Sequence, residues 1–241
     1  MLTEQRKTEV IELCKKLIAS RSYSGEETGV AEILREFMKE HGFDGCQTDS
    51  CGNVIGRITG NRDGARILFD GHMDTVPADH PEAWKYSPFT PVIEGGKLYG
   101  RGASDMKGAI AAFMTAAACF AQDYGRDFSG EIYVAGVVHE ECFEGVAARS
   151  VSEIVRPDYV VIGEASSLNI KTGQQLSSDS SVDGLFQVAR IKRRCKVVVE
   201  CSNQFQVILL FPLQKSRQRF NHAGMHILFY WIERKNDVSA E

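Results

Sequence analysis

The sequence has no stretch that could anchor it in a membrane and no excess of positive charge. Its longest apolar run, Ala109–Ala121, is shorter than the roughly 20 residues that cross a bilayer. Residues 1–20 are charged and amphipathic and lack the apolar core of a secretory signal. The net charge of −4 gives no sign of a nucleic-acid partner. We therefore expect a cytoplasmic protein that binds neither membranes nor nucleic acid.

The cysteines do not form the pattern of a disulfide framework or a thiolate metal site. There are seven, an odd number, and no two of them form a CxxC pair. Cys14, Cys119 and Cys142 lie in segments whose pattern is typical of packed elements. Reduced thiols in a cytosolic protein account best for this usage.

The last part of the chain has little glycine and a different charge balance. Residues 175–241 hold two of the 22 glycines, and Lys plus Arg outnumber Asp plus Glu there by 10 to 6, against 18 to 26 in residues 1–174. One strand, residues 197–201, is expected in this part, where pattern, turns and caps otherwise disagree. We therefore divide the chain into a fold-forming part, residues 1–174, and an atypical tail, residues 175–241.

The fold-forming part alternates between helical and strand patterns. Helices are predicted over residues 4–19, from about Ser24 to His41, over 109–124 and over 143–154. Strands are predicted over residues 53–58, 65–70, 130–138 and 158–163. Ser24 and Glu27 have the spacing of a capping box, and residues 75–102 form a long loop with four prolines. This alternation predicts an α/β fold, a mostly parallel sheet with helices on both faces.

Polar side chains follow the predicted strands at the points where they end. His72 and Asp74 follow one strand, Glu140 and Glu141 follow a second, and Glu164 follows a third. Asp105 comes after a glycine-rich turn and before a helix. Ligands of open α/β sheets bind at the carboxyl ends of strands, so these side chains are expected to meet in one crevice.

Such a cluster of carboxylates is costly without a cation. Like charges repel, and partial burial adds a desolvation cost that a divalent metal removes. One imidazole with several carboxylates suits zinc, manganese or cobalt better than calcium. Separately, each residue has a structural alternative: a loop histidine, a helix N-cap at Asp105, or a helix-dipole pair at Glu140 and Glu141. His80 and His139 are expected to be structural or solvent-facing.

Four motifs in order then become recognisable: FDGHMDTVP, YGRGASDMKGAIAA, VVHEE and VIGEAS. Together they resemble the metallopeptidase family of acetylornithine deacetylase, succinyl-diaminopimelate desuccinylase, aminoacylase and carboxypeptidase G. The long form DGHMDTVPADHPEAWKYSPF is similar to the branch of selenium-metabolism-linked hydrolases. The resemblance covers residues 1–174 and implies a zinc-exopeptidase-like fold, incomplete in this chain.

The resemblance also implies a two-metal site, with zinc expected and cobalt or manganese as alternatives. His72 resembles the imidazole ligand of one ion and Asp105 the ligand that bridges both. Glu164 resembles a ligand of one ion and Glu141 a ligand of the other. These four residues are the metal ligands that the family pattern predicts.

Two further residues resemble the family's catalytic groups. Asp74 matches the carboxylate that orients the imidazole ligand, and Glu140 matches the general base. The implied reaction is hydrolysis of an amide bond in an N-acyl amino acid or short peptide. The alternative is an inactive fragment that binds metal, and an unrelated α/β binding protein is the third reading.

The sequence departs from the family pattern after about residue 174. Family members continue into a lid or dimerisation domain and return with a second-site histidine; no GxxxH lid motif follows here. His222 and His226 are four apart, but their surroundings give no support for a ligand role. We therefore expect the family's dimer domain to be absent, one metal site to be incomplete, and residues after about 174 to come from a shifted reading frame. Sequencing the encoding DNA tests the last point.

Overall fold

The structure is a computed structural model, and it describes residues 3–143, 145–165 and 197–198. Its helices are α1 (Glu4–Ala19), α2 (Thr28–Glu40), the 3₁₀ turn η1 (Pro81–Ala83), α3 (Lys107–Tyr124), α4 (Glu140–Phe143) and α5 (Val146–Val155). The strands are β1 (Gly45–Thr48), β2 (Val54–Thr59), β3 (Arg62–His72), β4 (Val92–Glu94), β5 (Lys97–Tyr99), β6 (Ser129–Val137), β7 (Tyr159–Ile162) and β8 (Val197–Val198).

The main sheet has the strand order β1-β2-β6-β3-β7-β8. The pairs β6–β3, β3–β7 and β7–β8 are parallel, whereas β1–β2 and β2–β6 are antiparallel. The α/β class and the mostly parallel sheet are therefore confirmed, with an antiparallel edge. Because β6, β3 and β7 run the same way, their carboxyl ends meet at one end of the sheet.

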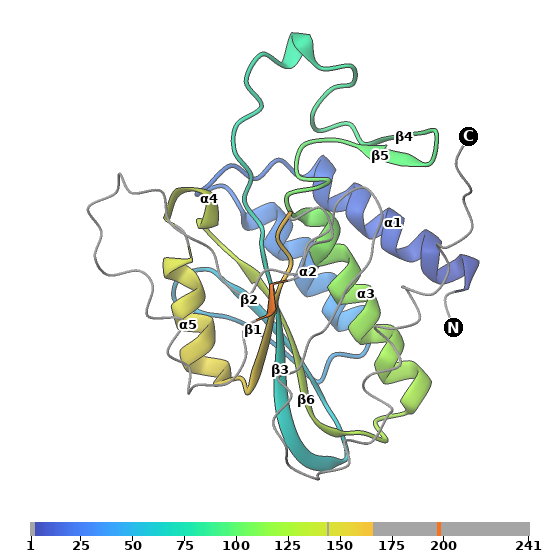
Figure 1. The fold of residues 1–241 in the computed structure, drawn as a ribbon, viewed down its shortest axis with the longest axis vertical. Helices are drawn as coiled ribbons and strands as arrows, with labels where there is room; N and C mark the ends of the chain where they lie inside the picture. Colours follow the sequence, from blue (N-terminus) through green and yellow to red (C-terminus); the bar gives the residue numbers. More distant parts are fainter. Residues whose placement is uncertain (1–2, 144, 166–196, 199–241) are drawn as a thin grey trace.

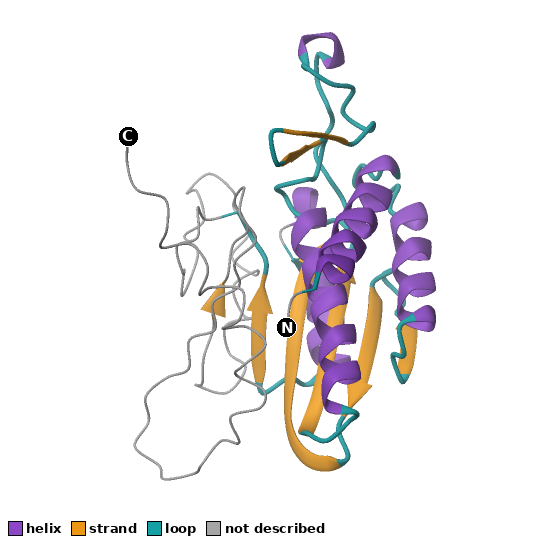
Figure 2. Ribbon diagram, turned by 90° about the vertical axis from the view of Figure 1, so that its right-hand side faces the viewer, coloured by secondary structure: helices purple, strands orange, loops and turns teal. Residues whose placement is uncertain are grey.

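Helices cover both faces of this sheet. Figure 1 shows α2 and α3 on one side with α1 outside them, and α5 on the other side. Figure 2, turned by 90°, shows these helices lying along the strands. Helix α3 is almost wholly buried, and close packing against the sheet requires glycine: a Cβ on Gly71 would lie 2.7 Å from Met106 Cε and 2.8 Å from Ile110 Cγ1.

Several sequence predictions are confirmed, and some are wrong. The first helix has the predicted bounds, and the predicted strands lie within a few residues of β2, β3, β6 and β7. The helix predicted over residues 143–154 corresponds to α5, which begins three residues later than predicted, after Gly145 at φ +78°. The short helix α4, which the sequence analysis did not predict, precedes it. The long loop carries η1 and the β4–β5 hairpin, which project above the sheet in Figure 1.

The capping box predicted at Ser24 and Glu27 does not form. Helix α2 begins after Glu27 without a side-chain cap, and the Ser24 hydroxyl donates to the Asp74 carboxylate instead. The expectation that Cys142 is packed is wrong, because it is exposed, whereas Cys14 is buried. No disulfide joins the five cysteines of the part that the structure describes.

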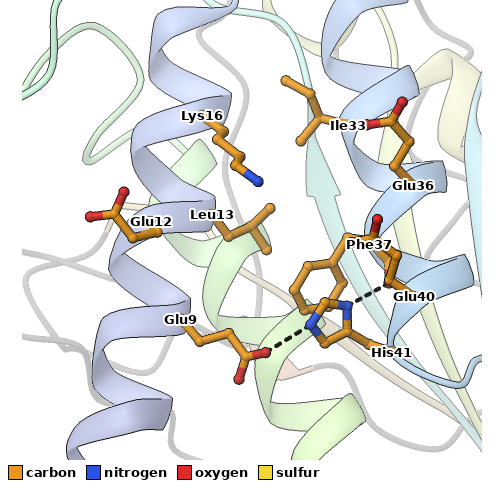
Figure 3. Close-up of a pocket in the computed structure, with 9 residues that line it drawn as sticks. All are labelled: Glu9, Glu12, Leu13, Lys16, Ile33, Glu36, Phe37, Glu40 and His41. Carbon is orange, nitrogen blue, oxygen red and sulfur yellow. Dashed lines mark hydrogen bonds and ion pairs between the residues drawn. The ribbon is translucent and has the colours of Figure 1, made fainter.

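A groove of about 360 Å³ lies between α1 and α2 (Figure 3). Glu9 of α1 is linked to His41, at the end of α2, by a contact of 2.7 Å between Glu9 Oε1 and His41 Nε2. The His41 ring stacks on Phe37, with ring centroids 3.8 Å apart. The residues that line it include none of the six side chains predicted to form the functional site. No helix within the described residues is long and apolar enough to cross a membrane.

Candidate metal centre

The predicted residues come together at the carboxyl ends of the parallel strands. His72 is the last residue of β3, Glu140 and Glu141 begin α4 just after β6, and Glu164 follows β7. Asp105 precedes α3 and reaches the same end of the sheet, since its carboxylate contacts His72. In Figure 1 the start of α3, α4 and the end of β7 all lie at this end. The side chains expected to meet are therefore brought together at this end of the sheet.

His72 is the buried centre of the cluster, with 2% of its surface exposed. Its Nδ1 lies 2.9 Å from the backbone oxygen of Asp74 and 3.6 Å from Asp74 Oδ1. Because a carbonyl oxygen accepts, Nδ1 carries the hydrogen and Nε2 faces the acidic side chains. Nε2 lies 2.9 Å from Asp105 Oδ1 and 3.9 Å from an oxygen of each of Glu140 and Glu164.

Asp74 connects the imidazole to the start of α4. Its fully buried carboxylate accepts from the backbone N–H groups of Glu140 and Glu141, each at 3.1 Å, and from the Ser24 hydroxyl at 2.7 Å. Burial alone would raise the pKa of Asp74, but the contact with His72 and the hydrogen bonds from Ser24 and Glu141 hold it below its ordinary value. Asp74 therefore stays ionised and fixes both His72 and the first turn of α4.

The potential ligand atoms form two sets that share His72. In each set, one atom from every residue lies within 4.8 Å of the others: His72, Glu140 and Glu164 in the first, and His72, Asp105 and Glu141 in the second. The His72 imidazole and four carboxylates from three other segments thus form two adjoining groups of donors. The structure therefore contains candidate ligands for a divalent metal.

Electrostatics show why these residues need a cation. Burial, together with neighbouring carboxylates, raises the pKa values of Glu140 and Glu141 and raises that of Glu164 to about 7. Burial disfavours a charged His72, but the bonds to Asp105 and Asp74 prevail and raise its pKa to about 11. A divalent cation would offset the repulsion among the carboxylates, so the donor set fits zinc, manganese or cobalt.

Asp70 is a member of this environment that the sequence analysis missed. It lies two residues before His72 on β3, so both side chains point to the same face of the strand. Burial raises the pKa of Asp70, His72 lowers it and Glu140 raises it, and the net result is a pKa of about 7. The strand alternation around His72 was the signal that could have identified it.

The remaining histidines lie as follows. His80 is exposed on the projecting loop, as expected, and pairs with Glu82 at 3.2 Å. His139 precedes α4 with φ +58°, and its ring lies 3.8 Å from Glu27 Oε1, which agrees with a structural role. His222, His226 and all of the predicted tail except Val197–Val198 lie outside the described residues.

The fold and the acidic cluster around one imidazole define an α/β protein with candidate ligands for a divalent metal. The model of Peptidase family M20/M25/M40 matches residues 68–222, and the chain belongs to this family. The succinyl-diaminopimelate desuccinylase of Nitrosospira multiformis is 35% identical over 191 residues, which cover 73% of this chain and 50% of that protein. A putative LysW-lysine/LysW-ornithine hydrolase of Pyrococcus furiosus is 38% identical over 162 residues, covering 67% and 43%.

Solved structures share the fold. Human carnosine dipeptidase 1 superimposes with a TM-score of 0.53 at 23% identity, covering 66% of this chain and 39% of that one. A dinuclear metal binding peptidase of the M20 family from Bacillus subtilis gives a TM-score of 0.54 at 17% identity, covering 70% and 46%. The chain spans about half the length of the curated relatives that it matches.

Proposed function

We propose that the protein is a metal-dependent amidohydrolase that cleaves the amide bond of an N-acyl amino acid or short peptide. The observation that carries the proposal is the convergence of four carboxylates on His72, in two sets of ligand atoms each within 4.8 Å. Membership of the M20/M25/M40 peptidase family supports this reaction class, as does the 35% sequence identity to a desuccinylase.

His72, Asp105, Glu141 and Glu164 are proposed to hold two divalent ions, with zinc as the expected metal. Asp105 is proposed to bridge the two ions; it lies with His72 and Glu141 in one set of donors. Asp74 fixes the imidazole with Nε2 toward the cluster, which is the orientation a ligand needs. When bound, the ions would polarise the substrate carbonyl and lower the pKa of water.

Glu140 is proposed as the general base. Its backbone is fixed by Asp74, and its carboxylate lies 3.9 Å from His72 Nε2, beside the proposed ligands. Burial raises its pKa, which makes it a stronger base than an ordinary glutamate. It would take a proton from the attacking water and deliver it to the leaving amine.

Hydrolysis by the purified 241-residue chain tests the proposal. The panel contains N-succinyl and N-acetyl amino acids and dipeptides, each with zinc, with cobalt and with a chelator. We expect turnover that needs metal and falls at least about 100-fold in Glu140→Gln, because one general base contributes about 10²–10⁴-fold. Glu82→Gln, on exposed η1, is the matched control and should keep full activity.

Two results would count against the proposal. Turnover that survives chelation or Glu140→Gln would place the chemistry elsewhere. If a folded sample binds metal but hydrolyses none of the substrates, the protein is a metal-binding protein and the proposed hydrolase activity is wrong.

A further inference from the structure

Four successive backbone N–H groups lead into the first turn of α4, and each donates to a buried side chain from another part of the chain. Val138 donates to Asn53 Oδ1 at 3.0 Å and His139 to Glu27 Oε1 at 3.0 Å. The next two donate to the two oxygens of Asp74, each at 3.1 Å. We call residues 138–141 the ligand turn, since they end in Glu140 and Glu141.

The ligand turn needs such support because its backbone has no regular partners. The chain leaves β6 at Val137 and bends at His139, where φ is +58°, before α4 begins. The first N–H groups of a helix have no partners within the helix, and a non-glycine residue with positive φ carries a cost. Side-chain acceptors therefore determine the direction in which the following carboxylates point.

Glu27 provides one of these acceptors from a segment that no family motif includes. It is 5% exposed and stands at the N-cap position of α2, yet its side chain makes no capping bond to that helix. Instead, Glu27 Oε1 accepts from Gly25 N and from His139 N, both at 3.0 Å. The buried carboxylate thus ties the α1–α2 connection to the ligand turn.

Asn53, the residue just before β2, provides the second acceptor. Its side chain is fully buried, and besides accepting from Val138 N it donates to Asp49 Oδ2 at 2.7 Å and to Ala147 O at 2.9 Å. Asp49 lies in the same loop before β2, whereas Val138 and Ala147 lie on distant segments, so the amide links this loop to the ligand turn and to α5. Its orientation is fixed by three bonds in three directions.

We propose that Glu27 and Asn53 are positioning residues, which set the direction of Glu140 and Glu141 through the backbone of the ligand turn. Neither residue belongs to the two sets of candidate metal ligands. The inference rests on the proposed function, because it assigns to these side chains the geometry of that same site. Glu27 and Asn53 thus hold the backbone of residues 138 and 139, in addition to the hydrogen bonds by which Asp74 holds residues 140 and 141.

Three variants of the full chain test the role of Glu27. Glu27→Ala removes the acceptor, and Glu27→Gln keeps an oxygen that can accept from Gly25 and His139. Glu26→Ala is the matched control, because Glu26 is the neighbouring glutamate but is exposed and pairs with Arg21 at 3.1 Å. Cobalt affinity and the visible absorption spectrum of bound cobalt are measured for each, with amide exchange at residues 138–141 in the metal-free protein.

We expect Glu27→Ala to bind cobalt about 10-fold or more weakly, the size of effect typical when support behind a ligand is lost. Its cobalt spectrum should change, and the His139 amide should exchange faster. Glu27→Gln should restore all three readouts and Glu26→Ala should leave them unchanged. Unchanged affinity and spectrum in Glu27→Ala, with unchanged exchange at His139, would overturn the proposal.

The failure of the proposed function looks different. In that case the wild-type chain itself would bind no cobalt, or would bind it without cleaving any amide of the panel. Amide exchange would then still decide whether Glu27 holds the ligand turn, and an exchange rate at His139 that is indifferent to Glu27→Ala would refute the positioning role on its own.

Discussion

The Nδ1 atom of His72 lies 2.9 Å from the backbone oxygen of Asp74 and 3.6 Å from its carboxylate. The nearer contact is thus made by the main chain, while the carboxylate is occupied by two N–H groups of the ligand turn and by the Ser24 hydroxyl. One residue therefore orients the imidazole and also holds the segment that carries Glu140 and Glu141.

Asp74→Asn tests this double role. An amide has one accepting oxygen, so at least one bond from the ligand turn or Ser24 is lost. We expect metal affinity to fall about 10–100-fold and the free energy of unfolding to fall by about 1–3 kcal/mol. Isothermal titration with zinc and urea unfolding measure the two effects, with exposed Asp79→Asn as control. Affinity within twofold of wild type would contradict the assignment.

Metal should stabilise the folded chain. A ligand that binds only the native state adds about 2.7 kcal/mol at 100 times its dissociation constant. We expect zinc to raise the melting temperature, a chelator to reverse the rise, and His72→Ala to abolish the response. His80→Ala, which removes an exposed histidine, should respond as wild type does. An equal shift in His72→Ala would place the metal at another site.

The burial of Lys107 leads us to predict that the stability of the fold depends on pH. It is fully buried at the start of α3, donates to Ser20 O at 2.8 Å, and burial lowers its pKa from 10.5 to about 8. Between these values the unfolded chain holds a proton that the folded chain has lost, so raising the pH favours folding. Relative to Lys107→Met, the wild type should gain stability from pH 8 to 10, by at most roughly 3 kcal/mol.

Urea unfolding of both proteins at several pH values measures this difference. The comparison with Lys107→Met cancels the titration of groups that the two proteins share. A stability difference that stays constant across the window, or that moves toward the variant as the pH rises, would show that folding does not lower the pKa of Lys107.

We predict that substitution of Gly130, far from the metal centre, destabilises the fold through a steric clash. Its φ is +92°, and an added Cβ would lie 2.1 Å from the backbone oxygen of Ala65. Gly42 also has positive φ, +73°, but a Cβ there would meet nothing within 4 Å. Both alanine variants carry the conformational cost, and we expect Gly130→Ala to lose about 1–3 kcal/mol more in urea unfolding. Equal losses would contradict the close approach.

Much of the fold follows from local pattern, and the differences have non-local causes. The first helix has apolar residues at helical spacing, and its predicted bounds match α1. Strand β1 was missed, because three of its four residues are exposed and show no alternation. Ser24 fitted a capping box, but its hydroxyl is used by Asp74, 50 residues away. Tertiary contacts of this kind cannot be recognised from a short segment of the sequence.

The candidate site divides in the same way. The motifs identified His72, Asp105 and the acidic residues, and the parallel strands bring them together. The support provided by Glu27 and Asn53 could not be predicted, since it depends on the path of the ligand turn past two distant segments. The metal identity, the general-base role of Glu140 and the shifted reading frame remain predictions.

The most direct test of the central claim is a cobalt titration of the purified chain, followed by visible absorption and by the number of ions bound per chain. The account predicts one or two tightly bound ions in the wild type and the loss of the signal in His72→Ala, with the variant still folded. A wild-type chain that is folded and binds no cobalt, or a His72→Ala variant that binds it equally well, would contradict the assignment of a metal centre to this cluster.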